Sequence, residues 1–219
     1  MENFFKILAR KESVKTDNLK KVLSPFGEVE VIPDVEGNLE GYAGMCGDLR
    51  QKNGQTNTTA WDLLFEDLAE EYTWVIEDDV AFNQKTIYSI LDSFESDLSD
   101  LISNRIHPKS ERPDWCWWHL NHRFEDPELW HSLNCFCRMS PTLIKKVKGY
   151  RDKHGKFLFH EILLPTLADT RLDFRATQFK EYFNNFHYDQ SKIDLSSVSG
   201  DAVYHPVKSD DKHVEICSA

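Results

Sequence analysis

The chain has 219 residues, of which 40% are apolar and 29% are charged, and its formal net charge is −11. This length favours one large α/β domain over two small ones, and the apolar share is enough for a sizeable core. The acidic balance disfavours nucleic acid as a partner, because neutralising phosphates needs a clustered basic surface. No stretch of about 18 apolar residues occurs, so no transmembrane segment is expected.

The first predicted elements form a βαβ unit. The stretches 3–9 (NFFKILA) and 28–32 (EVEVI) predict strands, and 16–23 (TDNLKKVL) predicts a short helix between them. Such a unit is the usual opening of a layered α/β fold. The stretch 33–59 is rich in Gly, Asn and Gln and predicts a long loop.

The rest of the chain continues the α/β pattern. Helices are expected over 61–71, over 82–94 with an extension over 98–106, over 142–150 after Ser140-Pro141, and over 159–168 with a kink at Pro165. Strands are expected over 72–76, 115–120, 134–139, 172–179 and 202–204. The stretch 72–76 (YTWVI) is a continuous apolar run, which is typical of a central, buried strand.

The five cysteines have no regular spacing: they are Cys46, Cys116, Cys135, Cys137 and Cys217. An odd number of irregularly spaced cysteines does not match the disulfide framework of a small secreted protein. We therefore expect reduced thiols and a cytoplasmic location.

Three consecutive carboxylates, Glu77-Asp78-Asp79, directly follow the central strand. Like charges this close raise each other's pKa, and a divalent cation relieves the repulsion because hard cations prefer several oxygen ligands. Ligands of open α/β sheets bind beyond the carboxyl ends of the strands, which is where this triplet is expected. The alternative is a surface turn whose acids cap the helix that begins near Phe82.

The stretch TWVIEDDVAF resembles the acidic motif, often Asp-x-Asp, of nucleotide-sugar glycosyltransferases of the GT-A type. The resemblance implies a GT-A fold, a three-layer sandwich around a mixed, mostly parallel central sheet. It implies that Asp79 ligates Mn²⁺ or Mg²⁺ directly and that Glu77 contacts the donor ribose or binds the metal through water. Glu in place of the usual first Asp leaves the role of Glu77 open. Asp78 is expected to cap the next helix or to serve the donor site.

A histidine near the end of the chain fits the same resemblance. In the stretch 201–208 (DAVYHPVK), a strand would deliver His205, and Pro206 would end that strand. Enzymes of this type often complete the metal shell with a late histidine, and neutral imidazole is a good ligand for Mn²⁺ beside carboxylates. Lys208 is expected to approach the diphosphate and offset the charge of the leaving group. The alternative for His205 is a partly buried side chain at a strand end.

The stretch 156–165 (KFLFHEILLP) resembles the acceptor-side helix of the same enzymes. The resemblance makes Glu161 the candidate catalytic carboxylate. In an inverting enzyme this carboxylate removes the proton of the acceptor hydroxyl, and in a retaining enzyme it stabilises or orients the sugar. His160, the second catalytic candidate, is expected to lie beside it and contact sugar hydroxyls. The alternative for Glu161 is a solvated residue at a helix end. Asp210 and Asp211 are weaker catalytic candidates.

Two further contact regions are expected around the substrates. The aromatic stretch 115–121 (WCWWHLN) suits a sugar, because pyranose faces stack on indole rings, and it makes Trp117 and Asn121 candidate acceptor contacts. By analogy of fold alone, the donor base and ribose would bind at Arg10 and Lys11, after the first strand, with contacts from the polar stretch 55–59.

The sequence therefore predicts one GT-A-like domain over 1–219, with a nucleotide-binding part over about 1–110 and an acceptor-binding part over about 111–219. The expected reaction is metal-dependent transfer of a hexose or deoxyhexose from a nucleotide-diphosphate sugar, with a UDP-sugar favoured, to a hydroxyl of a glycan or glycoprotein. The alternatives are a non-catalytic carbohydrate- or nucleotide-binding module and a metal-dependent phosphohydrolase. The phosphohydrolase is disfavoured because its aspartyl nucleophile should open the triplet, where this chain has Glu77.

A zinc site is a further alternative, suggested by five potential ligands: His119, His122, His131, Cys135 and Cys137. Their spacing matches none of the usual paired-ligand patterns. We therefore do not expect a zinc site.

Overall fold

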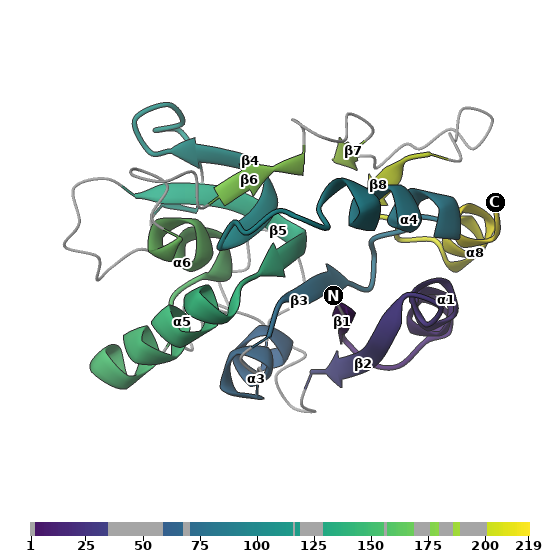
Figure 1. Cartoon of the computed structure of the whole chain (residues 1–219), viewed down its shortest axis with the longest axis horizontal. Helices are drawn as coiled ribbons and strands as arrows, with labels where there is room; N and C mark the ends of the chain where they lie inside the picture. Colours follow the sequence, from purple (N-terminus) through teal and green to yellow (C-terminus); the bar gives the residue numbers. More distant parts are fainter. Residues whose placement is uncertain are drawn as a thin grey trace.

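A computed structural model of the chain describes residues 3–34, 59–67, 71–115, 117–118, 129–155, 157–168, 176–179, 186–188 and 201–219. A six-stranded sheet with the order β2-β1-β3-β5-β4-β6 lies at its centre (Figure 1). The strands are β1 (Asn3–Ala9), β2 (Gly27–Pro33), β3 (Thr73–Glu77), β4 (Leu101–Pro108), β5 (Trp130–Met139) and β6 (Ala176–Gln178). Only β5 runs antiparallel to its neighbours, so the sheet is mixed and mostly parallel, as predicted.

A second, two-stranded sheet and six helices complete the described structure. The small sheet pairs β7 (Phe186–Tyr188) with β8 (Val203–His205) in parallel. The helices are α1 (Val14–Leu23), α3 (Thr59–Asp67), α4 (Gln84–Ser93), α5 (Pro141–His154), α6 (His160–Leu167) and α8 (Asp210–Ser218). Helices α1 and α8 lie side by side near the C-terminus (Figure 1).

Helices cover both faces of the central sheet through two separate hydrophobic clusters. One cluster joins α3, α5 and α6 to the sheet through buried side chains such as Leu64, Val147 and Leu163. The other joins α1 and α4 to the opposite face through Leu19 and Ile87. The described part of the chain is thus a mixed α/β structure with a sheet between two helical layers.

Strand β3 lies inside this sandwich and is buried on both of its faces. Val75 belongs to the cluster with α3, α5 and α6, whereas Trp74 and Ile76 belong to the cluster with α1 and α4. Because successive side chains of a strand point to opposite faces, a strand covered on both sides is a continuous apolar run. The prediction of a central strand here is confirmed, with Glu77 as its last residue.

Local chemistry explains where two of the helices begin and end. The side chain of Ser140 accepts a hydrogen bond from the Leu143 amide at the start of α5, and Pro141 occupies the first turn. Gly155 ends this helix with a φ of 75°, a left-handed conformation that glycine adopts at little cost. At α4 the side chain of Asn83 accepts a hydrogen bond from the Thr86 amide. The cap of α4 is therefore Asn83, which does not support the alternative that the acidic triplet caps this helix.

Two predicted elements are wrong. The stretch 98–106 does not extend α4, because Leu101–Pro108 forms β4, hydrogen-bonded between β5 and β6. Its apolar residues match helical spacing, but pairing with two neighbouring strands decides the conformation. The stretch 115–120 is no strand at its described positions. The chain forms turns here, because the Trp115 amide donates to the Arg112 carbonyl and the Trp118 amide donates to the Trp115 carbonyl. The Trp118 indole nitrogen also donates to the Arg112 carbonyl, at 2.7 Å.

The remaining predictions agree with the described elements to within a few residues at their ends. The helix over 159–168 is α6, and it contains Pro165 as expected. The strand over 172–179 is described only in part, as β6, and most of the predicted loop over 33–59 lies outside the described residues. Cys135, Cys137 and Cys217 are free thiols, and Cys46 and Cys116 lie outside the described residues. Among the helices described, none combines the length and apolar character needed to cross a bilayer.

Candidate metal centre

The acidic triplet lies at the carboxyl end of β3, beside the end of the parallel strand β1. Leu8 of β1 is the register partner of Glu77. The Asp78 amide donates to the Leu8 carbonyl at 2.9 Å, and the Val80 amide donates to the Glu77 carbonyl at 3.0 Å. These two bonds hold the triplet in a tight turn at the edge where ligands of open α/β sheets bind.

The C-terminal segment reaches this turn through backbone hydrogen bonds. Ala81 and Tyr204 exchange two of them, each 3.0 Å long. The Val207 amide donates to the Asp79 carbonyl at 2.7 Å. As a result His205, the last residue of β8, lies against the acidic turn.

Glu77, Asp79 and His205 each direct one potential ligand atom to the same place. These three atoms lie within 4.8 Å of one another. The His205 Nε2 atom is 3.2 Å from Asp79 Oδ1 and 3.7 Å from Glu77 Oε2. Within the described residues, no other group of three or more His, Cys, Asp or Glu side chains comes together in this way.

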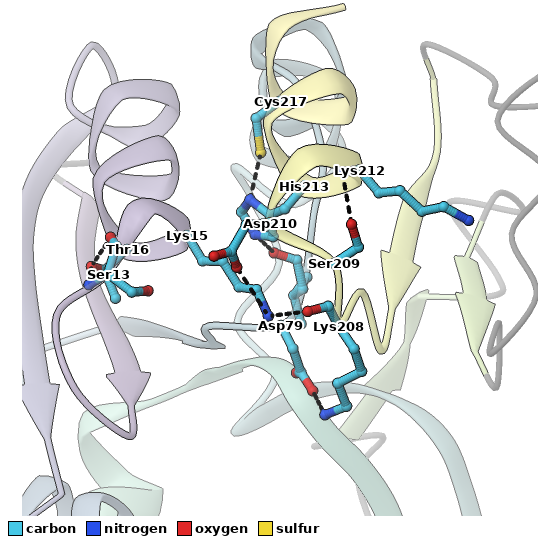
Figure 2. Close-up of polar contacts among 11 residues, drawn as sticks. Ser13, Lys15, Thr16, Asp79, Lys208, Ser209, Asp210, Lys212, His213 and Cys217 are labelled. Carbon is cyan, nitrogen blue, oxygen red and sulfur yellow. Dashed lines mark hydrogen bonds and ion pairs between the residues drawn. The ribbon is translucent and has the colours of Figure 1, made fainter.

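The second oxygen of each carboxylate has a different partner. The Trp61 indole nitrogen donates to Glu77 Oε1 at 3.1 Å. The Lys208 ammonium, on an exposed side chain, pairs with Asp79 Oδ2 (Figure 2). Each carboxylate is therefore held through one oxygen while the other oxygen faces His205.

Glu77, Asp79 and His205 form the candidate metal centre, and the charges of the two acids are balanced by those of His205 and Lys208. Burial raises the pKa of Asp79, but its interactions with His205 and Lys208 outweigh this and lower the pKa well below its ordinary value. The pKa of Glu77 is also lowered, since its interaction with the nearby His205 helps to overcome burial. Burial alone would lower the pKa of His205, but Cys135, Asp79 and Glu77 together raise it far above its ordinary value. The two acids are thus charged, as metal ligands must be, and His205 must release a proton to bind a metal.

The donor set fits a divalent cation of the predicted kind. Two carboxylates and one imidazole suit Mn²⁺, and Mg²⁺ is usually held by one or two carboxylates with substrate phosphates. Cys135 lies near His205, but burial raises the pKa of its thiol, so it does not offer a thiolate here. This chemistry favours Mn²⁺ or Mg²⁺ over a thiolate-bound zinc.

Helix α6 is anchored beside the centre by a buried polar network. The fully buried Asn134 donates to the His160 carbonyl at 2.9 Å. Its own side-chain oxygen accepts hydrogen bonds from Ser103 at 2.8 Å and Ser132 at 2.6 Å. The His160 ring stacks on Trp61 with a centroid distance of 4.0 Å and an interplanar angle of 10°.

Glu161, the predicted catalytic carboxylate, follows His160 and is half-buried. Burial first, and then the negative charge of Glu77, raise the pKa of Glu161 to about 8. A carboxyl group with this pKa carries its proton near neutral pH. Glu161 does lie in the first turn of α6, but the alternative of a solvated side chain does not describe it.

The other predicted contacts lie in different settings. Arg10 and Lys11 are exposed and directly follow β1. Trp117 is half-buried, with its ring centroid 5.8 Å from that of Phe159, and Asn121 lies outside the described residues. Burial, followed by the charge of Asp79, raises the pKa of Asp78 to about 6.

Potential zinc ligands do not gather within the described residues. The buried His131 stacks on Trp115 with a centroid distance of 4.5 Å. It forms no ligand cluster with Cys135 or Cys137 in the part of the chain that the structure describes. His119 and His122 lie outside that part.

Two residues that support the centre belong to no sequence motif, so the sequence does not predict their role. Trp61 appears in the sequence only as an apolar position of a helix, and nothing marks its bond to Glu77. Lys15 of α1 donates to the Lys208 carbonyl at 3.0 Å and lies 3.8 Å from Asp210 Oδ1, which joins α1 to the segment that carries His205 (Figure 2). Asp210, a weaker catalytic candidate, thus lies in the first turn of α8 in contact with Lys15.

Comparison with known proteins gives resemblances to solved structures only. No protein-family model matches the chain, and no curated protein is significantly similar to it. A solved structure described as a glycosyltransferase involved in the glycosylation of the major capsid of PBCV-1 is similar over 97% of this chain and 98% of its own, with a TM-score of 0.47 and 12% sequence identity. This TM-score is too low to transfer a function, so the function has to be argued from the geometry of the centre.

Proposed function

We propose that this chain is a metal-dependent glycosyltransferase. It would move a hexose or deoxyhexose from a nucleotide-diphosphate sugar, with a UDP-sugar favoured, to a hydroxyl of a glycan or glycoprotein. The observation that supports this most directly is the meeting of Glu77, Asp79 and His205 beyond the carboxyl ends of β1 and β3. Three protein ligands would leave room for phosphate oxygens of the donor to complete the metal's ligand set, as in other phosphate-binding metal sites.

On the donor side, Asp79, Glu77 and His205 would hold Mn²⁺ or Mg²⁺. When bound, the cation screens the diphosphate and stabilises it as a leaving group. Lys208 lies at the same carboxylate, on an exposed side chain, and can turn to the diphosphate. Arg10, Lys11 and Asp78 follow β1 and β3 at the same edge of the sheet and are proposed as donor contacts.

On the acceptor side, α6 would carry the catalytic carboxylate. Glu161 is proposed to accept the proton of the acceptor hydroxyl, a step that requires the Glu161 carboxyl to be ionised first. The charge of Glu77 contributes to the raised pKa of Glu161, so the two acids are electrostatically coupled. His160, with Trp117 and Asn121, would contact sugar hydroxyls and faces.

Thermal-shift titration with nucleotide sugars, with and without Mn²⁺, tests this proposal. A ligand that binds only the folded state raises its stability by mass action, so the melting temperature should rise for one donor and only when Mn²⁺ is present. Incubating that donor with a glycan panel should then release the nucleoside diphosphate. Binding without release would identify a non-catalytic module. Release of phosphate without any transferred sugar would identify a phosphohydrolase, and a response that ignores Mn²⁺ would exclude the metal centre.

A further inference from the structure

Trp61 links helix α3 to the last residue of β3. We propose that Trp61 is a positioning residue, which fixes the carboxylate of Glu77 so that one oxygen faces Asp79 and His205. This inference rests on the proposed metal centre. It goes beyond it by assigning a role to a residue that is not itself a ligand.

The bond between Trp61 and Glu77 is directional. The Trp61 side chain is fully buried, and its indole nitrogen donates to Glu77 Oε1 at 3.1 Å. An indole has this single N–H donor and no acceptor, so a carboxylate oxygen is a fitting partner at a buried position. Hydrogen bonds to a charged acceptor are also stronger than bonds between neutral groups.

The consequence of this bond is the orientation of the carboxylate. The terminal torsion of a glutamate side chain is broad and two-fold, so an unrestrained carboxylate would rotate. With Oε1 held by Trp61, the other oxygen, Oε2, lies 3.7 Å from His205 Nε2. Groups that orient a metal ligand in this way typically change the metal affinity 10- to 100-fold when they are removed.

The indole ring is itself held in place. It stacks on His160 at a centroid distance of 4.0 Å, and it contacts Phe65 at 5.5 Å. His160 in turn is tied to β5 through the hydrogen bond from Asn134 to its carbonyl. The donor that orients Glu77 is therefore fixed by the same helix that carries Glu161.

The variant Trp61→Phe removes the N–H donor and retains an aromatic ring. We expect it to weaken Mn²⁺ binding by about 10- to 100-fold in calorimetric titration. Trp74→Phe is the matched control. Trp74 is 2% exposed, so its replacement causes the same loss of side-chain volume in the core, but Trp74 has no bond to the metal centre. This control should bind Mn²⁺ as the wild type does. Melting curves of both variants without metal report the loss of packing separately.

A double-mutant cycle separates positioning from general damage. If Trp61 acts through Glu77, then Trp61→Phe should have little further effect on Mn²⁺ affinity in a Glu77→Gln background. Equal affinity of wild type and Trp61→Phe would overturn the positioning role and leave the metal centre standing. Absence of Mn²⁺ binding by the wild type would overturn the proposed function itself.

If Trp61→Phe fails to fold, the wild type still decides the matter. The chain has six tryptophans, whose indole N–H resonances can be followed by NMR during a titration with Mg²⁺ and then Mn²⁺. One indole resonance should shift on addition of Mg²⁺ and broaden first with Mn²⁺. If the protein binds both ions and no indole resonance responds, Trp61 does not contact a metal ligand.

Discussion

Asp79 and His205 come from opposite halves of the sequence, yet Asp79 Oδ1 lies 3.2 Å from His205 Nε2. Backbone bonds between Ala81 and Tyr204, and from Val207 to Asp79, hold the two segments together. The contact between these side chains is thus built into the fold and does not depend on chance contact of two surface groups. It also provides the first test of the centre.

Replacing Asp79 by Asn removes the charge of one proposed ligand at almost constant size. We expect the variant to keep its fold and to lose Mn²⁺ affinity by roughly 100-fold or more, since even partners of a ligand are worth 10- to 100-fold. Donor-induced stabilisation in the presence of Mn²⁺ should be lost as well. Calorimetry and thermal shift provide the two measurements.

The matched control is Asp92→Asn, which removes an exposed acid of α4 away from the centre. It changes the net charge by the same amount and should leave Mn²⁺ binding unaltered. Unchanged Mn²⁺ affinity in Asp79→Asn would remove the anchor of the proposed function.

Replacing His205 by Gln tests the balance of charge. Without metal, Glu77 and Asp79 lose a cationic partner, so we expect the free energy of unfolding to fall by about 1–3 kcal/mol. On addition of Mn²⁺ the variant should gain less stability than wild type, because it has lost one of the three proposed ligands and a weaker affinity gives a smaller stabilisation by mass action. Urea titrations with and without Mn²⁺ measure both effects, and equal stability of variant and wild type without metal would contradict the pairing.

The metal centre shows what a sequence can and cannot predict. Glu77 and Asp79 could be found because three acids after a buried apolar run are costly without a partner. His205 could be found only through the resemblance, since one histidine before a proline carries no chemistry by itself. Trp61 could not be found, because an indole at a buried helix position has the same pattern whether or not its N–H meets a carboxylate.

The fold shows a similar division. Strand β3 and helix α5 carry strong local patterns, a continuous apolar run and a Ser-Pro start, and both are where the sequence predicts them. Strand β4 has helix-like spacing and becomes a strand because β5 and β6 flank it, which is information from distant parts of the chain. Helix α8 was missed, and its cap, Ser209, is a common residue that marks a helix only once the structure is known.

Replacing Glu161 by Gln separates catalysis from binding. We expect turnover to fall by about 10²- to 10⁴-fold, the usual contribution of a general base. Donor and Mn²⁺ binding should survive, since Glu161 is not among the atoms that meet at the centre. The measurements are steady-state release of the nucleoside diphosphate and thermal shift with donor. Full activity of the variant would assign the proton transfer to another group, and loss of donor binding would place Glu161 in the donor site.

The last prediction concerns stability at acidic pH and the buried His213 of α8. The His213 Nε2 atom donates to the Val80 carbonyl at 2.9 Å, next to Asp79, and Nδ1 lies 3.6 Å from the Cys217 thiol. Burial raises the pKa of Cys217 to about 12, so the thiol keeps its proton and can donate it to Nδ1. Both ring nitrogens of the neutral imidazole therefore have a hydrogen-bond partner.

Burial lowers the pKa of His213 to about 4, with the Val80 bond and the charges of Lys15, Asp79 and Asp210 as smaller influences. In the unfolded chain the pKa is 6.5, so between these values the unfolded state binds more protons than the folded state. The contribution of His213 to stability is therefore complete above pH 6.5 and declines by roughly 3 kcal/mol as the pH falls toward about 4. His131, whose pKa is also lowered to about 4, adds to the decline in the same window.

The variant His213→Gln removes this titration and keeps a polar side chain. At neutral pH it should be less stable than wild type by about 1 kcal/mol, because the bond to the Val80 carbonyl is altered. Between pH 6.5 and 4 the stability of the variant should decline less steeply than that of wild type, because only the contribution of His131 to the decline remains. Urea unfolding at a series of pH values measures both slopes. Parallel pH profiles of wild type and variant would show that His213 does not stay neutral in the folded chain.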